Sequence, residues 1–151
     1  MITPSKHTDG QCKCLRPFVY FESNCYYFAN VPRYFDEAEE ICKEFSYHTT
    51  PGPYLLASVQ TAEENTFIYE RARQHWSTKD YWFGAKDDNL DGNFHWLDGS
   101  AMNFTSFALG EPTFNRHCLQ QWATKGWDDV SCSEREKHFV CKKSAMISSC
   151  M

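Results

Sequence analysis

A chain of 151 residues has the length of one ordinary globular domain and can bury a hydrophobic core. Aromatic residues make up 17% of it while Gly and Pro are few, which excludes a disordered or fibrous chain. The net charge of -5 argues against nucleic acid as a partner, and no run of about 18 apolar residues predicts a membrane span.

The cysteines indicate the compartment. There are eight, at positions 12, 14, 25, 42, 118, 132, 141 and 150. Zinc would require clustered pairs, but only Cys12 and Cys14 lie close together, and their one-residue gap is a poor zinc spacing. Disulfides are therefore favoured, and they predict a secreted, extracellular or lumenal protein. The polar start, Met1 to Gly10, has no apolar segment of a signal peptide, so the prediction of secretion depends on the cysteines alone.

The first elements in chain order are an arm, a hairpin and a helix. Residues 1–13 are polar and predict an arm. An aromatic segment, 14–28, is interrupted at Glu22-Ser23-Asn24, which suggests a short hairpin. The helix should begin with Asp36 as its N-cap. Its expected apolar face consists of Ala38, Ile41, Cys42 and Phe45.

A second helix is predicted from Thr61, because Glu64 three residues later completes a capping box. Its expected apolar face is formed by Phe67, Ile68, Ala72 and Trp76. Before it, Pro51-Gly52-Pro53 excludes helix and residues 55–59 suit a strand.

Beyond Lys79 the pattern changes to short strands, expected at 81–84, 94–97, 118–122 and 139–141 with turns at 98–99 and 125–126. Residues 100–117 lack periodicity and predict a long loop. A loop of this length inside a compact domain is usually functional.

Ordered motifs from Cys14 to Lys142 resemble the C-type lectin-like domain family. They are Cys14-Leu-Arg-Pro-Phe, Cys25-Tyr-Tyr, Cys42 in the first helix, Trp82-Phe-Gly-Ala, Phe94-His-Trp-Leu-Asp-Gly-Ser, Gly110-Glu-Pro-Thr, Trp127-Asp-Asp-Val-Ser-Cys and Phe139-Val-Cys. The resemblance implies an α+β fold with two helices, small antiparallel sheets, a long central loop and disulfide staples. It implies the pairs Cys14–Cys25, Cys42–Cys141 and Cys118–Cys132 in a domain spanning residues 14–143.

Cys12 and Cys150 are left over, the second in a C-terminal tail of residues 144–151. They can pair with each other, because domain termini often lie close together. The alternative is a bridge between chains that makes a disulfide-linked homodimer. The sequence leaves both open.

In the sugar-binding members, calcium is held by oxygen ligands that also bind sugar hydroxyls. Glu111 and Asp129 match those ligands, and Asp128 stands where Asn is usual. Two positions depart from the pattern: Thr113 replaces an Asn, and Arg116 replaces a Glu two residues before Cys118. A guanidinium about 4 Å from a divalent ion is repelled by about 2 kcal/mol in water. Arg116 therefore swings away, excludes the ion, or takes its place beside the acids.

A second acidic segment follows the expected strand at 81–84. Asp87 and Asp91 match weak ligands of an auxiliary calcium site in the family, although a solvated turn is favoured. An EF-hand is rejected because strand-like segments flank the acids where helices would be required. Asn103-Phe-Thr is a glycosylation sequon.

Aromatic and imidazole side chains in and near the long loop are further candidates for ligand contact. Trp127 is expected in the core; Trp122, Phe114 and His117 are candidates for contact with a sugar or a protein, although burial is favoured for each.

No nucleophile, phosphate-loop or zinc-hydrolase motif predicts an enzyme. The sequence predicts a secreted lectin that binds glycans or glycoproteins, with calcium as an open question. The alternative is a protein or other non-sugar ligand. The ligand residues expected are Glu111, Thr113, Arg116, His117, Trp122, Asp128 and Asp129.

Overall fold

A computed structural model describes residue 14 and residues 16–45, 54–77 and 80–145. Its helices are α1 (Phe35–Glu44) and α2 (Ala62–His75). Its strands are β1 (Val19–Phe21), β2 (Asn24–Phe28), β3 (Leu55–Leu56), β4 (Tyr81–Lys86), β5 (His95–Trp96), β6 (Cys118–Ala123), β7 (Gly126–Val130) and β8 (His138–Ser144). The described part contains no helix long and apolar enough to cross a bilayer. The arm, most of the tail, Cys12 and Cys150 lie outside the described residues.

The strands form one path in the order β1-β2-β8-β4-β6-β7, with β3 beside β8 and β5 beside β4. Most neighbours are antiparallel, as expected. One pairing is parallel: β4 lies beside β8, with Tyr81 opposite His138 and Trp82 opposite Phe139. This pairing joins two small sheets that the sequence predicted as antiparallel. The α+β class is confirmed, and the combined sheet is mixed.

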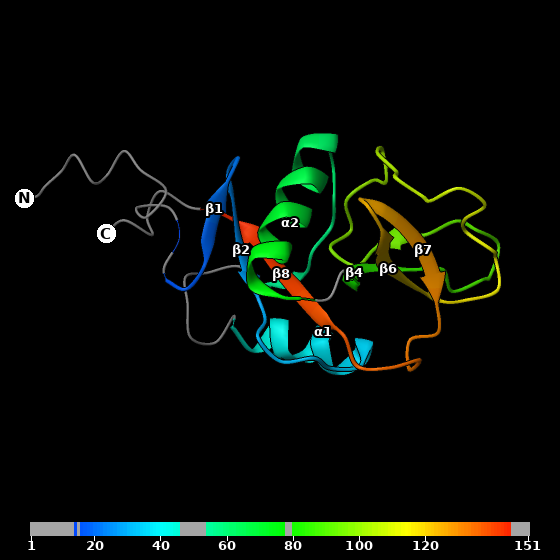
Figure 1. The fold of residues 1–151 in the computed structure, drawn as a ribbon, viewed down its shortest axis with the longest axis horizontal. Coiled ribbons are helices and arrows are strands. Elements are labelled where there is room, and N and C mark those ends of the chain that lie inside the picture. Colours follow the sequence, from blue (N-terminus) through cyan, green and yellow to red (C-terminus); the bar gives the residue numbers. More distant parts are fainter. Residues whose placement is uncertain (1–13, 15, 46–53, 78–79, 146–151) are drawn as a thin grey trace, which may run out of the picture.

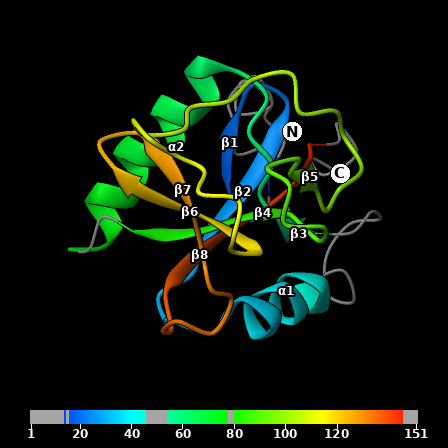
Figure 2. The same cartoon turned by 90° about the vertical axis from the view of Figure 1, so that its right-hand side faces the viewer.

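The two helices lie on opposite sides of the strands, α2 above and α1 below (Figure 1). Strand β4 serves both sides because successive side chains of a strand point to opposite faces. Trp82 packs with α1, whereas Tyr81 and Phe83 pack with α2. Figure 2 shows the same arrangement end-on. Burial on both faces fixes the frame that carries the long loop.

The first helix begins two residues earlier than an N-cap at Asp36 would place it, so the predicted N-cap is wrong. Tyr34 is the N-cap, and its backbone N–H donates to Glu37 Oε1 at 3.2 Å. Asp36 lies in the first turn, where the helix dipole stabilises a negative charge. Its carboxylate pairs with Lys86 at 3.6 Å. The predicted apolar face is present, with Ala38 and Cys42 fully buried.

The second helix has Thr61 as its N-cap, as predicted, and the Thr61 hydroxyl accepts from the Glu64 N–H at 3.0 Å. The reciprocal half of the capping box is absent. Glu64 Oε1 accepts from the Gln60 N–H at 2.7 Å, and Oε2 pairs with Lys142 at 2.5 Å. Tertiary pairing across the sheet therefore draws this carboxylate away from its local partner.

The strand predicted at 55–59 is shorter, because only Leu55 and Leu56 form a ladder. Ala57 then bonds to two neighbours, accepting from the Gly84 N–H at 2.8 Å and donating to Val140 O at 2.9 Å. A Cβ on Gly84 would lie 2.3 Å from Leu56 O. Only glycine permits this close crossing of the two backbones.

The three disulfides implied by the resemblance are confirmed as Cys14–Cys25, Cys42–Cys141 and Cys118–Cys132. The first closes the N-terminal hairpin and the second ties α1 to β8. The third joins the start of β6 to the segment after β7, next to the long loop.

Candidate functional site

The long loop lies at the end of the molecule that carries β6 and β7, away from β1 and β2 (Figure 1). It has no helix or strand of its own, as expected, but β7 holds it in place. Trp127 donates to Ser106 O at 2.8 Å, and Ala108 donates to Trp127 O at 2.9 Å. Phe104 and Phe107 pack against the Trp127 ring, which is fully buried as predicted. These contacts with Trp127 hold the loop segment that leads to Glu111 beside β7, the strand that carries Asp128 and Asp129.

Three of the predicted ligands meet here in an acid cluster, which we define as Glu111, Asp128 and Asp129. Thr113 holds Asp129 in place, because its N–H donates to Asp129 Oδ1 at 2.8 Å and its hydroxyl lies 2.9 Å from each carboxylate oxygen. Glu111 also lies close enough to Asp129 for the two carboxyl groups to shift each other's pKa. The structure thus brings together four residues that the sequence placed in two separate motifs.

The cluster is short of positive charge. Burial and the neighbouring Asp129 and Asp128 raise the pKa of Glu111. Burial is also the largest cause that raises the pKa of Asp128 to about 6, despite a hydrogen bond from Gln120. Burial opposes ionisation of Asp129 as well, but the Thr113 and Glu111 hydrogen bonds outweigh it and lower the pKa of Asp129.

Two carboxylate oxygens in the acid cluster have no partner. Glu111 Oε1 and Asp128 Oδ1 are covered from solvent and make no hydrogen bond. A covered acceptor without a donor is unfavourable, and a water or an ion is the usual remedy. Gln120 Oε1, beside Asp128, is in the same condition. Sequence reasoning missed Gln120, although the expected hairpin around Lys125-Gly126 places it opposite Asp128.

Calcium fits this donor set in part. The unpaired Glu111 and Asp128 oxygens are hard ligands. The pKa of each carboxyl group is raised by burial and by the neighbouring acids, and a bound cation would favour the charged form of both. Yet no group of three His, Cys, Asp or Glu side chains in the described residues forms a finished metal cage. Calcium takes about six to eight oxygens, so water or a ligand's hydroxyls would have to complete the shell.

Arg116 does not take the place of an ion in this structure. Its side chain is exposed, and Nη1 donates to Asn115 O at 3.3 Å. None of the ion pairs among the described residues joins Arg116 to the acid cluster. Arg116 instead lines a cleft together with Asn115, His117 and residues 130–134. Of the three arrangements open from the sequence, the one in which Arg116 pairs with the acids is not found, and the other two stay open.

The burial favoured for the other aromatic candidates is wrong. Trp122 is 50% exposed and Phe114 is 54% exposed, and His117 is exposed as well. Gln120 lies opposite Asp128, whereas Trp122, two residues further along β6, lies where the register between β6 and β7 shifts. The Phe114 ring rests on Gly92, where a Cβ would lie 2.4 Å from Cε1.

The weak auxiliary calcium ligands serve a turn. Asp87 is buried, and its carboxylate accepts from the N–H groups of Asp91 at 3.2 Å and Gly92 at 2.7 Å. Asp91 accepts from the Asn93 N–H at 3.0 Å. The turn predicted from the sequence is present, but it is organised by a buried carboxylate and only partly solvated. The segment connects β4 to β5, so the helices of an EF-hand are absent around it.

Comparison with known proteins now identifies the class. Residues 31–143 match the family model described as "Lectin C-type domain", which is well over half of the chain, and the chain belongs to this family of non-enzymatic binding domains. It is 34% identical over 137 residues to an "Alpha-N-acetylgalactosamine-specific lectin" of Patiria pectinifera, covering 84% of this chain and 78% of that protein. The chain is also 31% identical over 133 residues to the "Hepatic lectin" of Gallus gallus, and the match covers 85% of this chain and 58% of that protein.

The fold agrees with a solved lectin structure. The EPNH mutant of CEL-I superimposes with a TM-score of 0.78 at 27% identity, covering 85% of this chain and 95% of that one. The resemblance stated from the motifs is thereby confirmed, as is the predicted α+β fold.

Proposed function

We propose that the chain is a glycan-binding lectin whose ligand site is the acid cluster with Thr113 and Trp122. The observation that carries this proposal is the pair of unpaired oxygens, Glu111 Oε1 and Asp128 Oδ1, at the base of an exposed loop. No donor among the described residues reaches these atoms, and a glycan with an attendant calcium ion would satisfy them.

Each residue of this site has a separate task in the proposal. Asp129 is fixed by Thr113 and gives the site a rigid charged floor. Glu111 and Asp128 would hold calcium with Asp129, and the bound ion would supply a positive charge for sugar hydroxyl oxygens. Trp122 offers an exposed aromatic side chain on β6, two residues from Gln120, suited to stacking on the apolar side of a sugar.

The two relatives support a sugar as the ligand, since one is named for α-N-acetylgalactosamine and both are named as lectins. The motif Glu111-Pro112-Thr113 in this chain differs from the Glu-Pro-Asn of the EPNH mutant's name at its third position. The proposal therefore stops at glycans as a class.

A glycan array run with calcium and with excess chelator tests the function. We expect binding with calcium, a strong reduction with chelator, and loss of binding in Asp128→Asn and Glu111→Gln. Asp88→Asn is the matched control, because Asp88 is an exposed acid outside the cluster that contacts His95 at 3.6 Å. Trp122→Ala should weaken binding and cost less stability than the loss of a fully buried Trp, since the residue is 50% exposed.

The results separate the parts of the proposal. Binding that persists in excess chelator would overturn the assignment of calcium and leave the glycan function intact. Blank arrays under both conditions would overturn the glycan function itself.

A non-sugar partner is the second candidate, favoured by exposed apolar side chains. Leu109 and Phe114 lie in the long loop and Trp122 lies beside it. Exposed apolar groups of this kind are common at protein-binding surfaces. Blank arrays would shift the assignment to this candidate.

Secretion and a disulfide-linked homodimer complete the proposal. Secretion is supported by three disulfides, which persist in oxidising compartments. The dimer would form through Cys12 or Cys150, and two linked sites would raise avidity. Non-reducing electrophoresis tests it, and a monomer band would contradict it.

A further inference from the structure

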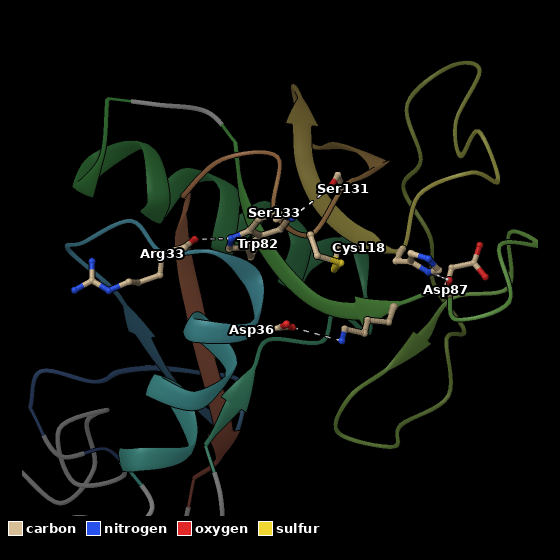
Figure 3. The surroundings of a disulfide bond; sticks show 10 residues. Arg33, Asp36, Trp82, Asp87, Cys118, Ser131 and Ser133 are labelled. Carbon is tan, nitrogen blue, oxygen red and sulfur yellow. Dashed lines mark hydrogen bonds and ion pairs between the residues drawn. A yellow bond between two sulfur atoms is a disulfide. The ribbon is translucent and has the colours of Figure 1, made fainter.

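A cleft of about 650 Å³ lies next to the acid cluster. One wall is the segment Asn115, Arg116 and His117, and the other is the segment 130–134 that follows β7. The disulfide Cys118–Cys132 ties the two walls together, and Figure 3 shows Ser131 and Ser133 near Cys118. The volume falls within the range of about 300–1,000 Å³ that is usual for small-ligand sites.

Arg116 gives this cleft an unneutralised positive charge. Its contact with Asn115 O uses one of five N–H donors, and no ion pair to it exists within the described part of the chain. His117 stands beside it with a fixed ring, because Nδ1 donates to Asp87 O at 2.9 Å. That carbonyl can only accept, so Nδ1 carries the proton.

The acid of the cleft does not cancel this charge. Glu134 is paired with Lys137, whose Nζ lies 2.6 Å from Glu134 Oε1. Lys137 is buried and also contacts Asp80 at 3.3 Å. The serine hydroxyls add neutral polar groups, and Ser131 Oγ accepts from the Ser133 N–H at 3.4 Å. The Arg116 side of the cleft is therefore its positive side.

The cleft and the acid cluster are close enough to share one ligand. Thr113 Oγ1, which holds Asp129, lies 2.5 Å from Asn115 Oδ1, and Asn115 lines the cleft. Along the other wall, Ser131 follows Asp129 by two residues, a backbone span of at most about 7 Å. A glycan seated at the acid cluster can therefore place a substituent over Arg116.

We propose that this cleft is a subsite for the anionic group of an acidic glycan, a carboxylate or a sulfate, with Arg116 as its principal contact. The inference rests on the proposed glycan function and names its ligand class. A guanidinium presents paired donors that match the oxygens of either anion. Its position also resolves an electrostatic conflict, because Glu111, Asp128 and Asp129 would otherwise repel an acidic sugar.

An array that carries each oligosaccharide in neutral, sialylated and sulfated forms tests the subsite. The wild-type protein should bind at least one acidic form about ten- to a hundredfold more tightly than its neutral counterpart, the range expected for hydrogen bonds to a charged group. Raising the salt concentration should reduce this preference, because the guanidinium is exposed. The sialylated and sulfated arms show which anion is preferred.

Arg116→Gln should lower the ratio of acidic to neutral binding from that of the wild-type protein to about one. Arg116→Lys should restore part of it, since an ammonium keeps the charge without the fork. Arg73→Gln on α2 is the matched control: it removes the same charge from an exposed position whose guanidinium lies over the Tyr69 ring, and should leave the preference intact. Circular dichroism verifies that each variant is folded.

Two results would overturn the inference, and they are distinguishable. If Arg116→Gln and wild type show the same ratio of acidic to neutral binding, the subsite is wrong while the lectin function stands. If the wild-type protein binds no oligosaccharide of any form, the proposed function fails and the subsite fails with it.

Discussion

Glu64 and Lys142 form a buried ion pair that should be a principal determinant of stability. The carboxylate and ammonium lie 2.5 Å apart, and their side chains are only 6% and 9% exposed. Tyr26 donates its hydroxyl to Glu64 Oε2 at 2.5 Å, and Lys142 donates to Ser58 O at 3.2 Å. Burial is the largest cause, followed by the Glu64 charge, that raises the pKa of Tyr26 far above its usual range, so this phenol stays neutral.

Glu64→Gln removes the negative charge and keeps the size and hydrogen-bonding capacity of the side chain. Removing one member of a buried pair typically costs about 3–5 kcal/mol, because the other charge stays buried without a counterion. We expect the low end, about 3 kcal/mol, because Lys142 retains its two contacts with Ser58. For a chain of this size that is a fall in Tm of roughly 10 °C.

Glu63→Gln is the matched control, because Glu63 is an exposed neighbour in the same first helical turn. Both substitutions remove one favourable charge from the helix N-terminus, an effect of about 0.3–1 kcal/mol. Urea denaturation of oxidised protein measures the free energy of unfolding for each. A second variant, Glu64→Gln with Lys142→Met, removes the stranded charge and should recover part of the loss. The reasoning is refuted if Glu64→Gln and Glu63→Gln agree within about 1 kcal/mol.

Three further predictions concern stability. Replacing Cys42 and Cys141 by Ala should destabilise the fold by about 4–5 kcal/mol, because this disulfide closes a sequence separation of 99 residues. Replacing Cys118 and Cys132 should cost about 3 kcal/mol, because their separation is 14 residues. Calorimetry should give that order of stabilities, and the reverse order would contradict the loop-entropy argument. Gly84→Ala should lower the stability by about 1–3 kcal/mol in thermal denaturation, because its Cβ would lie 2.3 Å from Leu56 O. Gly99→Ala is the comparison: its Cβ would meet no atom within 4 Å, so its cost reports backbone strain at positive φ alone. Burial opposes ionisation of Asp98, but hydrogen bonds from Ser100 and Ser58 and the charge of Lys142 outweigh it and lower its pKa below 3.8. This group thus stabilises the fold above its unfolded pKa and loses that contribution as pH falls through its folded pKa, so acid titration of Asp98→Asn should show a flatter decline below about pH 4 than wild type, and identical profiles would refute it.

The sequence alone determined the elements and the disulfide framework to a large extent. Helical periodicity identified α1 and α2 because an amphipathic helix repeats locally, whatever it packs against. The resemblance to the lectin family implied the three disulfide pairs, and the structure confirms them. The same motifs also indicated the Glu111 and β7 acids, since the residue types that bind calcium and hydroxyls are few.

Only the tertiary structure decided how these parts act. The sequence predicts that Glu64 caps its own helix, but its carboxylate forms an ion pair with Lys142 of β8, and no local sequence pattern predicts that pairing. Burial was favoured for Trp122 on its residue type, and the tertiary structure leaves it 50% exposed, because the burial of a strand residue depends on what packs against that face. The surroundings of Arg116 matter most for function. Its position in the sequence suggested a conflict with calcium, whereas in the fold it lines a cleft and forms no ion pair with the acid cluster. A side-chain direction depends on the backbone conformation of an irregular loop, which periodicity does not determine.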